Sequence, residues 1–110
     1  MELSNKQRHD IIALCCAVAH ADGNVSPLEF EHMLDLLMRI GQGSVGFEEL
    51  QTWLEQGPPP LNAKLPEAAI KTFLREAIGV ANADGRVDES ELAAIKRLVA
   101  GCFEGAEKYS

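Results

Sequence analysis

HADGNVSPLEF at residues 20–30 is repeated as NADGRVDESEL at residues 82–92. Both stretches contain Ala-Asp-Gly, any residue, Val, three further residues and Glu, and the offset between them is 62 positions (82 minus 20). Apolar residues also match at this offset on both flanks: Ile11 with Phe73, Ile12 with Leu74, Val18 with Val80, Phe30 with Leu92, Met33 with Ile95 and Leu37 with Val99. The sequence therefore predicts two similar helix–loop–helix units that pack about a pseudo-twofold axis.

Each repeated phrase carries the signals of one helix ending and another beginning. Glycine readily adopts the left-handed conformation that ends helices, so Gly23 and Gly85 predict helix stops. Ser26 and Asp88 are N-cap residues, and a Glu three residues after each completes a capping box. We expect the valine in each phrase, Val25 and Val87, to point into the core.

Helical spacing of apolar residues continues through most of the chain, and no segment alternates with a period of two. The inward-facing sets that we expect include Phe30, Met33, Leu34, Leu37 and Ile40; Phe47, Leu50, Trp53 and Leu54; Ile70, Phe73, Leu74, Ala77, Ile78 and Ala81; and Leu92, Ile95, Leu98, Val99 and Cys102. Prolines make GPPPLNAKLP an extended connector. The predicted fold is all-α, a bundle of five helices or slightly more in one domain, 1–110: repeat 1 at about 4–41, an insert with one short helix at 42–65, and repeat 2 at about 66–104.

Composition places this chain of 110 residues among globular proteins, with 46% hydrophobic and 25% charged residues. The net charge of −7 argues against nucleic acid as a partner and leaves room for a cation or a basic protein surface. No apolar run is long enough to span a membrane, and the first residues do not have the pattern of a signal peptide. We therefore expect a cytoplasmic protein whose three cysteines are small core residues.

The repeated phrase matches part of a calcium-binding EF-hand loop. With Gly23 at the sixth loop position, Asp22 is the fifth and Glu29 the twelfth, but Val18 and His20 stand where the first and third ligands belong. The second copy, with Asp84 and Glu91, has the same gaps, so one loop alone would be a poor calcium site. Every residue of the phrase also has a structural role without metal, as helix stop, core contact or cap, and both interpretations remain open.

AHADGNVSPLEFEHMLDLL and ANADGRVDESELAAIKRLV resemble the paired motifs of the TerB-like family, which includes the tellurite-resistance TerB proteins and the N-terminal region of DnaJ-like membrane co-chaperones. The resemblance extends from about Ile11 to Cys102. The resemblance implies a non-enzymatic helical bundle that acts in a bacterial stress response. It also implies that the bundle binds a divalent metal ion, with Ca²⁺ and Mg²⁺ as the favoured candidates. The acidic positions that it implies as ligands are Asp22, Glu29, Asp84 and Glu91.

The function predicted from these features is that of a non-enzymatic module that binds a divalent cation weakly through its two acidic corners and recruits a protein partner. The alternative is a metal-free helical adaptor or an immunity-type binding protein. Catalytic motifs are missing from the sequence: Glu29-x-x-His32 resembles half of a di-iron site, but Ala94 stands where the second unit needs a histidine. We expect His20 to favour the end of its helix rather than a metal.

Overall fold

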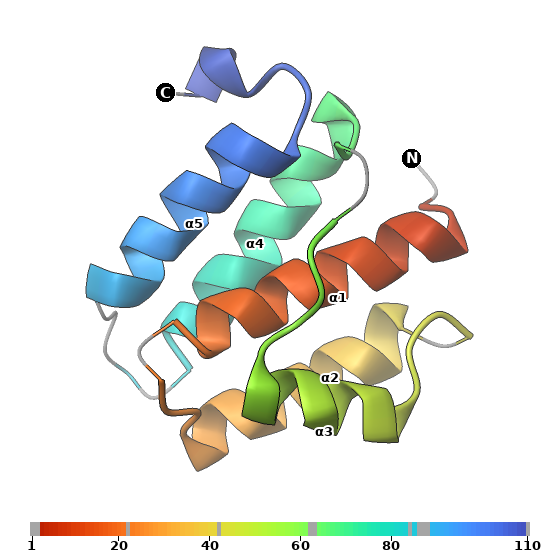
Figure 1. The fold of residues 1–110 in the computed structure, drawn as a ribbon, viewed down its shortest axis with the longest axis vertical. Helices are drawn as coiled ribbons and strands as arrows, with labels where there is room; N and C mark the ends of the chain where they lie inside the picture. The colour runs from red at the N-terminus through yellow and green to blue at the C-terminus, as the bar shows by residue number, and fades with distance from the viewer. Residues whose placement is uncertain are drawn as a thin grey trace.

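The two repeated units each fold as a helix, a corner and a second helix (Figure 1). The computed structural model describes residues 3–21, 23–41, 43–61, 64–83, 85 and 89–109. The first unit contains α1 (Asn5–Ala19) and α2 (Pro27–Ile40), and the second contains α4 (Ile70–Ala81) and α5 (Glu89–Cys102). Between them lies α3 (Phe47–Gln56), and 3₁₀ turns occupy Glu67–Ala69 and Ala106–Tyr109. The predicted all-α fold is confirmed.

Helix α2 shows how local sequence determines a helix boundary. The Ser26 hydroxyl accepts a hydrogen bond from the Glu29 backbone N–H at 3.1 Å, and Glu29 Oε1 accepts one from the Ser26 N–H at 2.8 Å. This reciprocal pair satisfies two N–H groups that the first turn of a helix leaves without a partner. Pro27 occupies the first helical position, where its missing N–H costs nothing. The Asp88 cap predicted for α5 lies outside the described residues.

The two corners are built with the same hydrogen bonds. In the first, the N–H groups of His20, Ala21 and Gly23 donate to the carbonyls of Cys16, Val18 and His20 at 2.9, 3.2 and 2.9 Å. In the second, the N–H groups of Asn82, Ala83 and Gly85 donate to the carbonyls of Ile78, Val80 and Asn82 at 3.0, 3.2 and 3.0 Å. Gly23 has φ = 79° and Gly85 has φ = 84°, so the predicted left-handed stops are confirmed.

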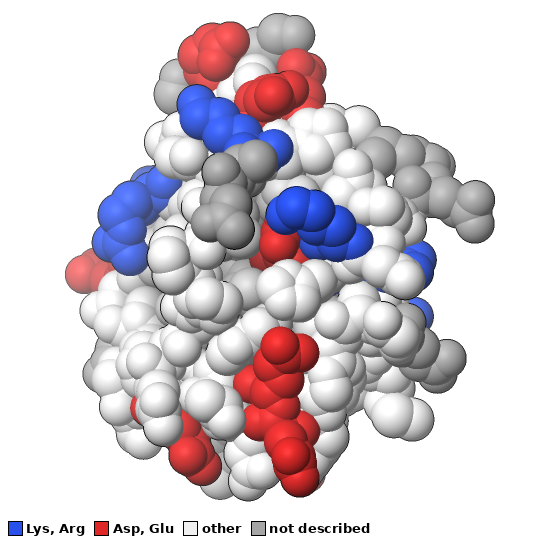
Figure 2. Space-filling model, turned by 45° about the vertical axis from the view of Figure 1, so that its right-hand side comes forward, with Lys and Arg blue, Asp and Glu red and all other residues white. Residues whose placement is uncertain are grey.

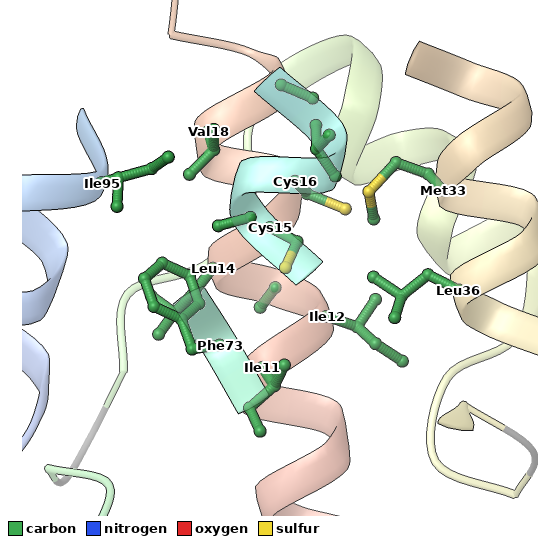
Figure 3. Packing of buried hydrophobic residues seen from close by; sticks show 14 of the residues in the cluster. Ile11, Ile12, Leu14, Cys15, Cys16, Val18, Met33, Leu36, Phe73 and Ile95 are labelled. Atoms are coloured by element: carbon green, nitrogen blue, oxygen red, sulfur yellow. The ribbon is translucent and has the colours of Figure 1, made fainter. Parts of the chain in front are cut away.

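Packing between the units follows the predicted pseudo-twofold exchange. Helix α1 packs against α2, α4 and α5, and α4 packs against α5, α1 and α2, as expected if α1 exchanges with α4 and α2 with α5. Figure 3 shows Cys16 facing Met33 of α2 on one side of α1, and Val18 facing Ile95 of α5 on the other. Ile95 is the repeat equivalent of Met33, and all four side chains are buried.

The segment between the units is asymmetric. Helix α3 packs on α1, and in Figure 1 α3 and the connector after it lie on the near side of α1 while α4 lies on the far side. The connector then joins the end of α5: the Leu65 N–H donates to the Cys102 carbonyl at 2.8 Å, and the Glu104 N–H donates to the Leu65 carbonyl at 2.9 Å. Within the described ranges, this isolated bridge is the one β-type pairing.

Several predictions of burial were wrong. Phe47, Ile78 and Leu92 are 52%, 51% and 40% exposed, although their helical spacing placed them in the core. Ile78 and Leu92 occupy positions whose repeat equivalents in the first unit are covered, whereas no described element covers them in the second. Conversely, the fully buried Leu36 was missing from the predicted set.

The valines of the two corners and the segment after α5 add to the comparison of predicted and observed burial. Val25 is half-buried and packs against the core as predicted, and Val87 lies outside the described residues. Phe103 is 1% exposed, and its ring lies 5.2 Å from that of Phe73, in the segment that follows α5.

In the described part of the chain, none of the helices has the length and apolar character needed to cross a membrane.

Candidate functional site

The two Asp-Gly corners lie at the same edge of the bundle, where α1 and α4 end (Figure 1). Of the four carboxylates predicted as ligands, Glu29 and Glu91 are described, and both are buried, with 4% and 3% of their surface exposed. Asp22 and Asp84 lie outside the described residues. The structure therefore places one buried carboxylate in the first turn of the second helix of each unit.

Glu29 lies in the first turn of α2 and is stabilised by backbone groups at the start of that helix. Its Oε1 accepts the Ser26 N–H, and its position in the first turn of α2 lets the helix dipole favour its negative charge. Among the described residues, no Lys, Arg or His nitrogen lies within 4.0 Å of this carboxylate. Glu29 is thus a buried acid whose observed partner is a neutral backbone group.

The other buried acids outside the corners have cationic partners. Asp10 accepts Lys6 Nζ at 3.0 Å. Glu76 accepts both terminal nitrogens of Arg39 at 3.0 Å, and Arg75 Nε lies 3.6 Å away. The hydrogen bonds from Arg39 lower the pKa of the Glu76 carboxyl despite its burial, so this acid is ionised at neutral pH. These acids are structural ion pairs.

The described residues do not form a metal site by themselves. No group of three or more His, Cys, Asp or Glu side chains suited to a metal occurs in the part of the chain that the structure describes. Calcium in proteins takes 6–8 oxygen ligands. Glu29 and Glu91 supply one carboxylate to each corner, so a cation there would also require Asp22 and Asp84.

The two histidines near the first corner have other contacts. His20 caps the end of α1, and its Nδ1 lies 3.2 Å from the Leu54 carbonyl oxygen, which ties the corner to α3. The His32 ring lies against Gly79 of α4, where an added Cβ would come within 2.8 Å of its Cε1. His32 therefore packs between helices and is not directed at the corner with Glu29.

The cysteines and Ser44 do not have the surroundings of activated nucleophiles. Cys15 and Cys16 are buried and free, and burial raises the pKa of both thiols, that of Cys16 to about 12. Burial also raises the pKa of the half-buried Cys102. The Ser44 hydroxyl donates to the Gly41 carbonyl at 2.8 Å rather than to a base. The prediction that the cysteines at 15 and 16 are core residues is confirmed.

An apolar hollow of about 510 Å³ lies between α1, α5 and the proline connector. Its lining is mostly Ala, Leu and Pro, with Lys64 and Cys102 as polar members. On the face drawn in Figure 2, the Lys and Arg side chains stand in separate groups in the upper half and form no continuous basic surface. That nucleic acid is not a partner stays a prediction.

Comparison of this chain with known protein families, with characterised proteins and with solved structures found no significant match.

Proposed function

We propose that this chain is a non-enzymatic, TerB-like helical module that binds a divalent cation weakly at its two acidic corners and recruits a protein partner. The family assignment rests on the doubled motif described above, and with it the setting in a bacterial stress response or a tellurite-resistance-like system. The proposal of cation binding is based on the partners of the Glu29 carboxylate.

The Glu29 carboxylate is the main evidence for a cation at the first corner. A buried charge is costly unless it is paired and hydrogen-bonded, and the buried acids Asp10 and Glu76 both have cationic partners. Glu29 is equally buried, yet its partner among the described residues is the Ser26 N–H. A divalent ion held by Asp22 and Glu29 would supply the missing positive charge.

The repeat supports the same proposal for the second corner. Glu91 is buried to the same degree as Glu29, and the backbone hydrogen bonds before it match those of the first corner. Because each corner supplies few oxygens, water must complete the coordination of the ion, and we expect a dissociation constant on the order of 10⁻⁴–10⁻³ M.

Titration with Ca²⁺ and Mg²⁺, followed by the NMR signals of the Gly23 and Gly85 amides and by thermal unfolding, tests the proposal. At roughly 10 mM ion, the expected affinities correspond to about 1.4–2.7 kcal/mol of added stability for each occupied corner. The double variant Asp22→Asn/Glu29→Gln should keep its fold, because Gln also completes a capping box, but should lose the part of this gain that comes from the first corner.

A matched control separates the site from general charge effects. Glu31→Gln/Asp35→Asn makes the same change in net charge on exposed positions of α2 and should leave the gain intact. If no ion shifts either amide or stabilises the parent, the cation site is wrong.

A metal-free adaptor is the second candidate, and the capping geometry favours it. Ser26 and Glu29 already satisfy each other with two hydrogen bonds, and the helix dipole favours the charge without a metal. In that case Glu29→Gln should be nearly neutral for stability at every ion concentration.

A further inference from the structure

Helix α3 packs on one face of α1, and its adjacent residues Trp53 and Leu54 meet side chains from both halves of that face. Near the start of α1, the His9 ring meets Trp53 edge-on with 5.1 Å between centroids. At the other end, His20 Nδ1 lies 3.2 Å from the Leu54 carbonyl oxygen. These contacts mark the face of α1 that α3 occupies.

The side chains between these two contacts are completely covered. Ala13 and Cys16 lie on the same helical face as His9 and His20, because residues three or four apart are neighbours on a helix. They are 1% and 0% exposed. In the first unit this face is shielded from water by α3 together with its neighbours, since Cys16 also faces Met33 of α2 (Figure 3) and Ala13 lies beside the proline connector.

Adding the repeat offset of 62 to the residue numbers of this α1 face gives the equivalent positions on α4. The equivalent residues are Lys71, Arg75, Ile78 and Asn82, and all four are exposed. Ile78 is 51% exposed where its equivalent in α1 is fully buried. Helix α4 packs against α1, α2, α5 and the turn before it, and this exposure shows that none of them covers the face.

Helix α5 extends the uncovered surface. Leu92 is 40% exposed and is the repeat equivalent of the half-buried Phe30, while the exposed Lys96 corresponds to the half-buried Leu34. The α4 face is defined here as Lys71, Arg75, Ile78, Leu92 and Lys96. It carries two exposed apolar side chains and three cations, in a chain whose net charge is −7.

We propose that the α4 face is a docking surface for an amphipathic helix of a partner protein, with acidic side chains flanking its apolar stripe. The chain itself supplies the precedent, since α3 turns Leu50, Trp53 and Leu54 inward on the equivalent face and exposes its glutamates. The three cations select the charge of the occupant, because complementary charges at the rim of an interface favour one partner over another.

A second copy of this chain is a poorer occupant. In a symmetric dimer through the α4 face, the same patch lies on both subunits, so the cations of one subunit would be brought near those of the other. Arg75 is 74% exposed, and its Nε lies 3.6 Å from the Glu76 carboxylate, which also accepts two hydrogen bonds from Arg39.

The inference rests on the recruiting role proposed above but not on the cation, and its test is run in EDTA so that the two fail separately. The probes are a set of helical peptides with the apolar spacing of α3, Leu-x-x-Trp-Leu, flanked either by Glu or by Lys. The ¹⁵N-labelled protein reports binding through its amide shifts. We expect the Glu-flanked peptides to shift the amides of Lys71, Arg75 and Ile78.

Two variants and one control locate the site. Ile78→Glu should weaken binding of the Glu-flanked peptides about tenfold or more, and Lys71→Glu/Arg75→Glu should do the same and transfer preference to the Lys-flanked peptides. Phe47→Glu introduces the same charge at a residue of matched exposure, 52% against 51%, on a different surface, and should bind as the parent does. Circular dichroism checks that each variant is folded.

The outcomes decide the proposal. Shifts confined to the α4 face, with the expected charge preference, support it. It is overturned if peptides with either flank bind equally, if the shifts lie on another face, or if no peptide binds. It is also overturned if vesicles of phosphatidylglycerol shift these amides and the peptides do not, because the surface would then bind anionic lipid.

Discussion

Replacing Gly79 by alanine should change stability in opposite directions depending on the residue at position 32. Gly79 lies inside α4, where alanine is favoured over glycine by about 0.8–1.0 kcal/mol in helix propensity. In this protein the added Cβ would lie 2.8 Å from Cε1 and 2.9 Å from Nε2 of His32, closer than real contacts allow. The ring must move, and overpacking of this kind costs about 1–3 kcal/mol.

The two effects together give the expected magnitudes. In the parent, Gly79→Ala should lower the free energy of unfolding by about 0–2 kcal/mol, the overpacking cost less the propensity gain. In a His32→Ala background the obstacle is gone, and the same substitution should raise stability by about 1 kcal/mol. The equivalent interface between α1 and α5 has alanine at both positions, because Ala17 and Ala94 are the repeat equivalents of Gly79 and His32.

Urea unfolding of the four proteins in this cycle, followed by far-UV circular dichroism, measures the coupling directly. We expect a coupling free energy of about 1–3 kcal/mol between positions 32 and 79. If Gly79→Ala has the same effect in both backgrounds, the contact between the ring and the helix does not limit the packing of α2 on α4.

Three other expectations concern the corners and the ion pair. Gly23→Ala should destabilise by about 1–2 kcal/mol in urea unfolding through its φ of 79° alone, since nothing lies within 4 Å of the added Cβ. Ser26→Ala should cost about 1 kcal/mol in the same assay, and a variant as stable as the parent would show that the capping box contributes nothing. Because Arg39 lowers the pKa of Glu76 in the fold, the pair adds stability above the unfolded pKa of about 4.5 and loses it as the pH falls through the folded pKa. Glu76→Gln should flatten thermal stability over that acidic range, and an unchanged pH profile would contradict the assignment.

Local chemistry made most helix boundaries predictable. Ser26 caps its helix as expected, Ser4 caps α1 with the same kind of capping box, and the prolines keep the connector extended. These signals act within a few residues, so they do not depend on the rest of the fold. The second repeat begins less simply: Pro66 is followed by a 3₁₀ turn at Glu67–Ala69 before α4 begins at Ile70.

Burial was harder to predict because it depends on neighbours distant in sequence. Phe103 follows the last turn of α5 and is buried beside Phe73 of α4, in the segment that pairs with Leu65 of the connector. Neither residue carries a local signal for the other. The candidate site shows the same division, since the capping partner of Glu29 was evident from spacing, whereas the lack of a nearby cation among the described residues required the structure.

A single inserted helix gives the two units different surfaces. The repeat makes Cys16 and Ile78 equivalent, yet Cys16 is fully buried and Ile78 is half exposed. On this face α1 has His9 and Ala13, and α4 has the cations Lys71 and Arg75, which suit contact with water. Between these cations and the exposed Asn82, however, α4 has the apolar Ile78. In the docking proposed above, an acidic amphipathic helix would cover Ile78 and pair with the two cations beside it.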